Sequence, residues 1–593
     1  GVNLNFPPVG GILRRGGAFY IRRSFAGQPL YTAVFKTYLD VLLGKGYPVE
    51  FFPEGGRSRT GRLLKPKMGM LSMVVDSFIG QPNRKAAIVP VYIGYDKLVE
   101  SGSYLKELRG KSKQKESAAG LLKASKIFDS SYGSPYVSFG EPLVLDEALS
   151  TMQPDWRHRL AKNDREWLPS AVTGIAQMNM SRINDAVIVS PVGLVAMIML
   201  SSPQHALAEW ALLEQIDHFL ELLRKIPYSK DMVLPEGTPE QIFEQAARTA
   251  GIARIDHDWG SLVTVSGDEA VLMTYYRNSV MHILALPSLV ARFFRHSESI
   301  SERELVERCT LLYPFLKQEL SLHYDDRESV TTIRMIINAF VEQGLLSRNR
   351  IKRELVRPDV GSAEFTVLTG LGRVLRETLE RYVMCSQMLV QEISEQPQPR
   401  KQVEENLVKM AERMAVLTGR AAPEFFDKSL FRIYLDSLIE RGLVISETVE
   451  VEPSDADVEQ TSDTKGKSEV KSDKKSDPQP TTFESLLLNP RLQLITEQWI
   501  ALLGPNVQQN MQQLIREPNS QNQKQEDAAP KRKGWGKLID KAGLAKSESS
   551  ELEVQPESSS EVPQDPNLEE QAVEQDLAVD EASLENEKNS TEK

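Results

Sequence analysis

Apolar residues in the first 145 positions form short runs that alternate with one clear helical pattern. Apolar residues from Leu30 to Leu43 recur at helical spacing, and this pattern ends at Gly44 and Gly46, which suits a helix C-cap. Strands and helices that alternate along a chain favour a layered α/β fold, so we predict a mixed sheet with flanking helices over residues 1–150. Three runs have the length and composition of buried strands: residues 47–52, 86–93 and 136–139.

From residue 151 to residue 446 the apolar spacing is almost wholly helical, which predicts a second, α-helical domain. Beyond residue 446 the composition shifts to Ser, Asp, Glu, Lys and Pro, so we expect the main folded body to end there and a linker to cover residues 447–480. Apolar residues return at roughly helical intervals over 481–517, where we predict a helical island. Residues 518–593 are predicted to be a disordered acidic tail.

The charge is distributed unevenly along the 593-residue chain, whose formal net charge is -11. Residues 1–67 hold eleven Lys or Arg against three acids, whereas residues 548–593 hold fifteen acids against two lysines. The front of the chain therefore attracts anions. A nucleic-acid partner is not expected, because these cations cluster in glycine-rich loops and lack interleaved aromatic residues on which bases could stack.

Cysteine and apolar content limit the class of protein further. The two cysteines, Cys309 and Cys385, exclude a disulfide framework and no Cys/His group has zinc spacing, so we expect a reducing setting and no metal. The most apolar stretch, residues 186–200, is too short and too interrupted to span a bilayer. Residues 280–294 are apolar enough to lie at a membrane interface, but a buried core helix is the favoured interpretation.

The segment FFPEGGRSRTGR, residues 51–62, carries the clearest chemistry. It follows a predicted strand, and loops at strand ends are where α/β folds place their sites. Its glycines let the backbone approach a ligand, and Arg57, Arg59 and Arg62 offer planar donor forks that suit phosphate oxygens. A solvated surface loop is the alternative. A nucleotide-binding P-loop is excluded because Arg62 and Leu63 replace the required Lys and Ser/Thr.

A second basic group lies in GAFYIRRSF, residues 17–25. Alternating apolar residues predict a strand that turns Arg22 and Arg23 to opposite faces, so at most one of them is expected to reach the site. The alternative is that both guanidinium groups lie along the surface or pair with surface carboxylates.

These two segments, together with AAIVPVYIGYD at residues 86–96, resemble the second, third and fourth conserved blocks of the glycerolipid acyltransferase superfamily, specifically the bacterial membrane-bound glycerol-3-phosphate acyltransferases. The resemblance extends through YVSFGEPL, VLMTYYRNSV, LYPFLKQEL and APEFFDKSLF to about residue 446. It therefore implies an α/β acyltransferase core followed by a helical domain, and it does not include the acidic tail.

The resemblance implies a reaction in which a fatty acyl group passes from acyl-CoA or acyl-acyl-carrier-protein to the 1-hydroxyl of glycerol 3-phosphate, giving lysophosphatidate without a cofactor or metal. It also implies a glycerol-3-phosphate site with Pro90 shaping the adjacent acyl side. The substrate-binding residues that it implies are Arg22, Arg23, Glu54, Gly55, Arg57, Ser58, Arg59 and Pro90.

The family's first block, H-x-x-x-x-D, supplies the general base and the aspartate that orients it, and no histidine of this sequence has an aspartate five positions later. Because the chain opens with Gly1 rather than Met, we expect an N-terminal truncation, and we expect these residues alone to be inactive. His282 lies on an apolar face, and we predict a core role for it rather than that of a substitute base.

Three alternatives for function stay open: the same chemistry on dihydroxyacetone phosphate or lysophosphatidate, a catalytically dead scaffold, and, more weakly, nucleic-acid binding. The acyltransferase hypothesis also predicts that the protein lies peripherally on the cytoplasmic face of the bacterial inner membrane, because the acylated product partitions into lipid. The expected partners are therefore glycerol 3-phosphate, the acyl donor and a membrane lipid surface.

Overall fold

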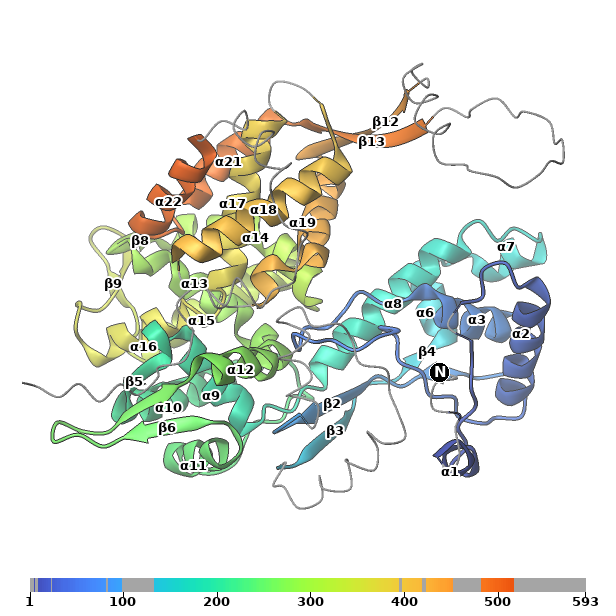
Figure 1. Ribbon diagram of the computed structural model, residues 1–593, viewed down its shortest axis with the longest axis horizontal. Coiled ribbons are helices and arrows are strands. Elements are labelled where there is room, and N and C mark those ends of the chain that lie inside the picture. The colour runs from blue at the N-terminus through green and yellow to red at the C-terminus, as the bar shows by residue number, and fades with distance from the viewer. Residues whose placement is uncertain are drawn as a thin grey trace, which may run out of the picture. The chain divides into compact units, whose positions relative to one another are not determined.

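The described residues up to Asp185 build a small α/β layer, shown in blue and cyan in Figure 1. The computed structural model describes residues 5, 9–22, 24–81, 84–98, 133–393, 397–418, 423–451 and 481–516, all within the compact unit Gly1–Ala545. The elements of the first part are α1 (Val9–Arg15), α2 (Pro29–Gly44), α3 (Met68–Ile79), β1 (Ala87–Ile88), β2 (Val91–Tyr95), β3 (Pro135–Phe139), β4 (Leu143–Val144), α6 (Leu145–Met152), α7 (Trp156–Ala161) and α8 (Leu168–Asp185).

The sheet layer of the described residues consists of two antiparallel pairs of strands. This corrects the prediction of a mixed sheet. Strand β1 pairs with β4, and β2 pairs with β3. The predicted strand over 86–93 is interrupted because Pro90 has no N–H to donate, while its carbonyl oxygen accepts a bond of 2.8 Å from the Gly140 N–H. Residues 47–52 form no strand, because no described segment pairs with them.

The helices of this first part share one apolar core. The predicted helix over 30–43 is confirmed as α2, which ends at Gly44, and Gly46 then turns the chain with a φ of 78°. Helices α3, α6 and α8 bury Val75, Leu149 and Ile175 against one another. This core holds the cavity-facing loop and strands in place from one side.

The second part is helical, as its spacing predicted, with short antiparallel strands between the helices (Figure 1). Its helices are α9 (Pro191–Ser201), α10 (Glu209–Lys225), α11 (Pro239–Thr249), α12 (Gly267–Val280), α13 (Ala285–Arg292), α14 (Glu302–Leu320), α15 (Asp326–Glu342), α16 (Ala363–Leu371), α17 (Arg376–Glu392), α18 (Arg400–Thr418), α19 (Lys428–Glu440), α21 (Pro490–Ile500) and α22 (Pro505–Arg516), with the 3-10 turns η3 (Pro203–His205), η4 (Met281–Leu284), η5 (Phe293–Arg295) and η6 (Pro423–Phe426). The strands are β5 (Ala206–Ala208), β6 (Ile252–Ile255), β7 (Leu262–Val265), β8 (Ser299–Ser301), β9 (Ser347–Asn349), β10 (Glu354–Val356), β11 (Gln398–Pro399), β12 (Val444–Val451) and β13 (Thr481–Leu488), in three sheets with the orders β5-β7-β6, β8-β10-β9 and β11-β13-β12.

The two most apolar segments of the sequence lie in the core of this helical part. Every residue of α9 is buried. Residues 280–294 are buried too, in the end of α12, η4, α13 and η5, so the core interpretation of this segment is confirmed over the interfacial one. No helix in the described part of the chain is both long and apolar enough to cross a bilayer.

The chain returns to the folded body after residue 480, which corrects the expectation that this body ends near 446. Residues 481–488 are not helical but form β13, which pairs with β12 from Val444↔Leu488 to Val451↔Thr481. Helix α21 then packs on α17 and buries Trp499. Residues 447–451 of the predicted linker belong to β12, which corrects that part of the prediction. The rest of the predicted linker, residues 452–480, and the predicted tail, residues 518–593, lie outside the described residues.

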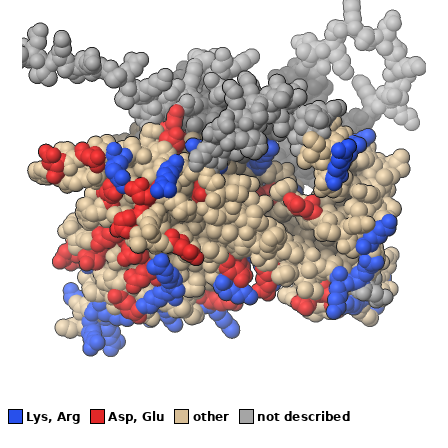
Figure 2. Space-filling model, turned by 90° about the horizontal axis from the view of Figure 1, so that it is seen from below, with Lys and Arg blue, Asp and Glu red and all other residues tan. Residues whose placement is uncertain are grey.

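Charged side chains are unevenly distributed over the face of the described residues that Figure 2 shows. Figure 2 shows Asp and Glu side chains mixed with Lys and Arg over the left of that face, while fewer acidic side chains appear at the right. The first part of the chain, to which Figure 1 gives the elements α2, α3 and α7, lies at the right in both views.

Candidate active site

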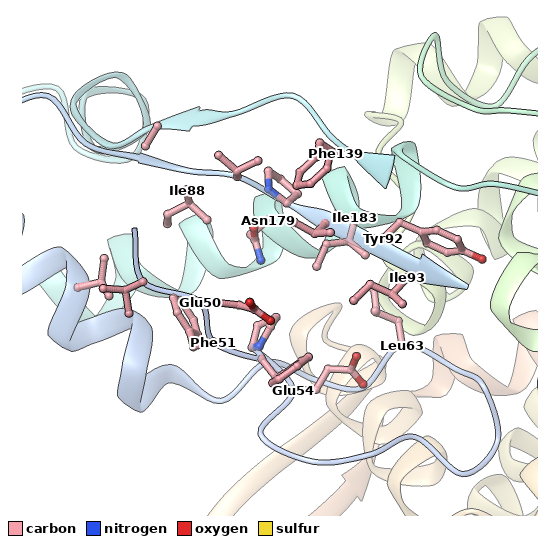
Figure 3. Close-up of a pocket in the computed structure, with 18 of the residues that line it drawn as sticks. Glu50, Phe51, Glu54, Leu63, Ile88, Tyr92, Ile93, Phe139, Asn179 and Ile183 are labelled. Carbon is pink, nitrogen blue, oxygen red and sulfur yellow. The ribbon is translucent and has the colours of Figure 1, made fainter. Parts of the chain in front are cut away.

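A large cavity opens between the loop of residues 47–54, strand β2 and helices α3 and α8. Its volume is about 1130 Å³. Figure 3 shows apolar side chains around it, among them Phe51, Ile88 and Ile183, with Glu50, Glu54 and Asn179 as polar groups. A space of this size and lining suits a ligand with a long apolar part.

Glu54 is held at one side of this cavity by its own loop. Its Oε2 accepts a hydrogen bond of 3.0 Å from the Leu64 N–H. Burial raises the pKa of Glu54, and the bond from Leu64 opposes this rise in part. The carboxylate therefore holds the returning chain at Leu64 while it faces the cavity (Figure 3).

A tight turn brings the loop to the cavity. Gly55 has a φ of 60°, and a Cβ there would lie 2.8 Å from Cγ of Lys67, so this turn favours glycine. The Lys67 N–H donates to the Pro53 carbonyl at 2.7 Å and closes the loop. Ser58 lies beyond the turn and lines the cavity, and its buried Oγ has no partner among the described residues.

The structure gathers three of the predicted substrate-binding residues around this cavity: Glu54, Ser58 and Pro90. It does not place the other described ones on the cavity wall: Arg22, Gly55, Arg57 and Arg59. Arg57 and Arg59 are exposed and flank Ser58 in sequence, each with interactions of its own. Arg23 lies outside the described residues.

The segment around Arg22 is not the predicted strand in its described residues. Phe19 packs against Phe35 and Tyr38 of α2, with ring centroids 6.1 and 5.4 Å apart, so aromatic packing on the helix fixes this segment instead. The Arg22 guanidinium is exposed, lies over the Tyr31 ring at 4.8 Å and donates to Gln28.

Arg62 has a structural role that differs from the phosphate contact suggested by its motif. Its side chain is only 5% exposed and forms an ion pair with Glu319 of α14. Its Nη2 donates to Thr378 Oγ1 of α17 at 3.1 Å. Glu319 also accepts from Arg381 at 2.5 Å and from the Tyr382 hydroxyl at 2.9 Å. The end of residues 51–62, which we call the glycine loop, is therefore anchored inside the helical part.

Neighbouring contacts extend this anchor along residues 60–65. The Asn278 side-chain amide donates to the Thr60 carbonyl at 2.7 Å. Gly61 lies so close to α12 that a Cβ there would meet the Tyr275 carbonyl oxygen at 2.0 Å. Lys65 pairs with Asp436 of α19 at 2.8 Å. Four helices of the second part thus fix the segment that follows the candidate site.

His282 does not act as a substitute base beside the loop in this structure. This side chain is buried in η4, as predicted for a core residue, and its Nε2 lies 3.2 Å from the Asn184 carbonyl oxygen. Burial lowers the pKa of His282 to about 4, so its ring is neutral near pH 7. His282 is one of the residues that line the cavity, and its ring contacts the backbone of Asn184.

Sequence comparison covers most of this architecture. Residues 104–447, more than half of the chain, match the family model for the glycerol-3-phosphate acyltransferase C-terminal region, and residues 2–94 match an acyltransferase model. The chain belongs to the glycerol-3-phosphate acyltransferase family. This confirms the resemblance that the sequence blocks indicated. Arg62 lies in the region that matches the acyltransferase model, whereas its partner Glu319 lies in the region that matches the C-terminal model.

Several curated relatives share the name of the family. Proteins called glycerol-3-phosphate acyltransferase from Pseudomonas putida (strain W619) and Pseudomonas syringae pv. syringae (strain B728a) are 43% and 42% identical over 447 residues. One from Ectopseudomonas mendocina (strain ymp) is 42% identical over the same length. The matches cover 75% of this chain and 53–54% of each relative. The chain thus spans about half the length of the relatives it matches.

Proposed function

We propose that this protein takes part in the transfer of a fatty acyl group from acyl-CoA or acyl-acyl-carrier-protein to the 1-hydroxyl of glycerol 3-phosphate, the first step of phospholipid biosynthesis. The observation that carries the proposal is the match, at about 42% identity over three quarters of the chain, to proteins named for this activity. In the reaction the hydroxyl oxygen forms an ester bond to the acyl carbon, the C–S bond of the thioester breaks, and the thiol leaves with a proton.

The proposed acceptor site lies where the glycine loop meets the cavity. Arg57 and Arg59 flank Ser58, which lines the cavity, and their guanidinium groups are proposed to turn from their present contacts to the bound phosphate. Bidentate, charge-assisted bonds would then fix the distance between the hydroxyl and the thioester. Arg22 and Arg23 are proposed to add positive charge, and Glu54 and Gly55 to shape the turn.

The acyl chain is proposed to lie along the apolar wall of the cavity, beside Pro90. The cavity of about 1130 Å³ is lined by residues such as Phe78, Ile88 and Ile183, which support this assignment. Neither a cofactor nor a metal takes part in the proposed reaction.

Proton removal needs a general base, which the family resemblance assigns to the histidine of H-x-x-x-x-D. Residues 1–593 hold no such pair. We therefore propose that these residues bind and orient substrates but do not turn them over alone. Peripheral attachment to the cytoplasmic face of the inner membrane is proposed because the product partitions into lipid.

Calorimetry with glycerol 3-phosphate and with glycerol tests the acceptor proposal. Saturable binding of glycerol 3-phosphate, with glycerol at least about a hundredfold weaker, is expected because charge-assisted bonds to the phosphate supply most of the affinity. Equal affinity for the two compounds, or no binding of either, would overturn the proposal. Dihydroxyacetone phosphate, titrated in parallel, decides between the two acceptors.

A further inference from the structure

Four arginines meet where the end of α13 faces the start of α17, far from the glycine loop in sequence. The turn before α17 lies directly on α13: a Cβ at Gly372 would be 3.1 Å from the backbone of Arg292, and the Leu375 N–H donates to Ser288 Oγ at 3.1 Å. We call this group the arginine cluster, and its members are Arg292, Arg295, Arg373 and Arg376.

Arg292 is the most deeply buried member, and one of its hydrogen-bond donors has no partner among the described residues. Arg292 is 1% exposed, and its Nε and Nη2 donate to the Leu502 carbonyl at 3.0 and 2.6 Å. Its Nη1 is buried and has no hydrogen-bond partner among the described residues, and the same holds for Nε of Arg373. Buried donors without partners cost free energy, so an anion that accepts from them would be bound favourably.

Carboxylates near the cluster do not balance its charge. Glu377 accepts from Arg376 at 2.8 Å and also faces Arg277 at 3.4 Å, and Glu380 faces Arg292 at 3.4 Å. Among the described residues, Glu377 and Glu380 thus face a group of four guanidinium groups. The excess of guanidinium groups makes the local potential positive.

The ionisation of neighbouring groups agrees with this potential. Burial, and then the charges of Arg295 and Arg376, lower the pKa of Arg373 to about 10. Burial, and then the charges of Arg295 and Arg292, lower the pKa of His296 to about 4.

The start of α17 adds a partial positive charge at the same place. This helix has 17 residues, and Leu375 at its N-cap makes no side-chain capping bond. The helix dipole and its first N–H groups favour an anion there. Arg373 and Arg376 lie at this helix start, and Glu377 in the first turn supplies one carboxylate there.

We propose that the arginine cluster is a binding site for a phosphoryl anion, separate from the acceptor site at the glycine loop. Two partly exposed arginines, Arg295 and Arg373, would contact the anion from outside, while Arg292 supports them from within. Planar guanidinium groups recognise phosphate oxygens in pairs. The anion is the phosphoryl group either of the acyl donor's nucleotide or of a lipid headgroup.

Hydrogen exchange of the whole chain with inorganic phosphate tests the site. Phosphate is expected to protect the amides of residues 293–296 and 372–377. In Arg373→Gln the phosphate concentration that gives half-maximal protection is expected to rise about tenfold or more. Arg295→Gln provides a second variant, and Arg303→Gln on α14, 89% exposed, is the matched control. Thermal unfolding confirms that each variant is folded.

Protection confined to residues 52–62, or equal protection in the chain and in both cluster variants, would overturn the site. The acceptor proposal is judged separately, because its loop gives its own protection signal. Coenzyme A and phosphatidylglycerol vesicles then compete with phosphate in separate arms. Competition by coenzyme A assigns the site to the donor, and competition by the vesicles assigns it to a lipid headgroup.

Discussion

Gly61 connects the candidate site to the helical part through its backbone. Its φ of 76° favours glycine, and an added Cβ would lie 2.0 Å from the Tyr275 carbonyl oxygen, which is too close for any relaxed contact. Gly61→Ala is therefore expected to lower the free energy of unfolding by about 2–4 kcal/mol in urea titration. The control is Gly56→Ala, which has an ordinary φ and no atom within 4 Å of its Cβ. Equal losses in both variants would contradict the close packing.

The family resemblance implied eight substrate-binding residues, and it is a property of short sequence segments. Glu54, Ser58 and Pro90 line the cavity, whereas Arg22, Gly55, Arg57 and Arg59 do not. Arg62 has the same local signature as Arg57. It differs because its partner Glu319 lies 257 positions away, and no local pattern contains that pairing.

At the scale of elements, helix α21 contributes to the core of the helical part. Trp499 is 2% exposed and its ring lies 5.4 Å from that of Phe315. Trp499→Ala is expected to lower the free energy of unfolding by about 3–5 kcal/mol, because it leaves a cavity. Leu494→Ala on the same helix is the control, since Leu494 is 63% exposed. A Trp499→Ala protein as stable as its control would mean that α21 is not docked.

The type of an element could be predicted where the spacing of its apolar residues pointed to the same structure as its other local signals. The helix α2 was predicted because its apolar spacing and its terminal glycines point to the same structure. Residues 481–488 were predicted as helix because a short apolar run fits either period, and pairing with β12 decides for a strand. The run over 47–52 has strand composition, but a strand also needs a neighbour to satisfy its backbone.

For the whole molecule, Glu319 links the two regions matched by the family comparisons. Its carboxylate lies between Arg62 and Arg381, so Glu319→Gln leaves two buried guanidinium groups without their anion. The free energy of unfolding is expected to fall by about 3–5 kcal/mol at pH 7. Glu307→Gln, an exposed position on the same helix, should change it by less than about 1 kcal/mol.

The difference in unfolding free energy between the chain and Glu319→Gln should depend on pH, which gives a second check on the ion pair. Burial alone would raise the pKa of Glu319, but Arg381 and Arg62 bring it below its ordinary value of 4.5. The stabilisation is therefore present above pH 4.5 and is lost as the pH falls through the lower, folded-state pKa. Unfolding titrations should show the two proteins converging at acidic pH. A constant difference would contradict the charged pair.

The glycine loop is proposed to bind the phosphate of glycerol 3-phosphate, and a calorimetric titration measures this binding. The titration compares the chain with Arg57→Ala, and with Arg303→Ala as a control at an exposed arginine of α14. Loss of one guanidinium group is expected to weaken binding about tenfold or more in Arg57→Ala alone. If the chain binds glycerol 3-phosphate and Arg57→Ala binds it with unchanged affinity, the phosphate is not held by Arg57.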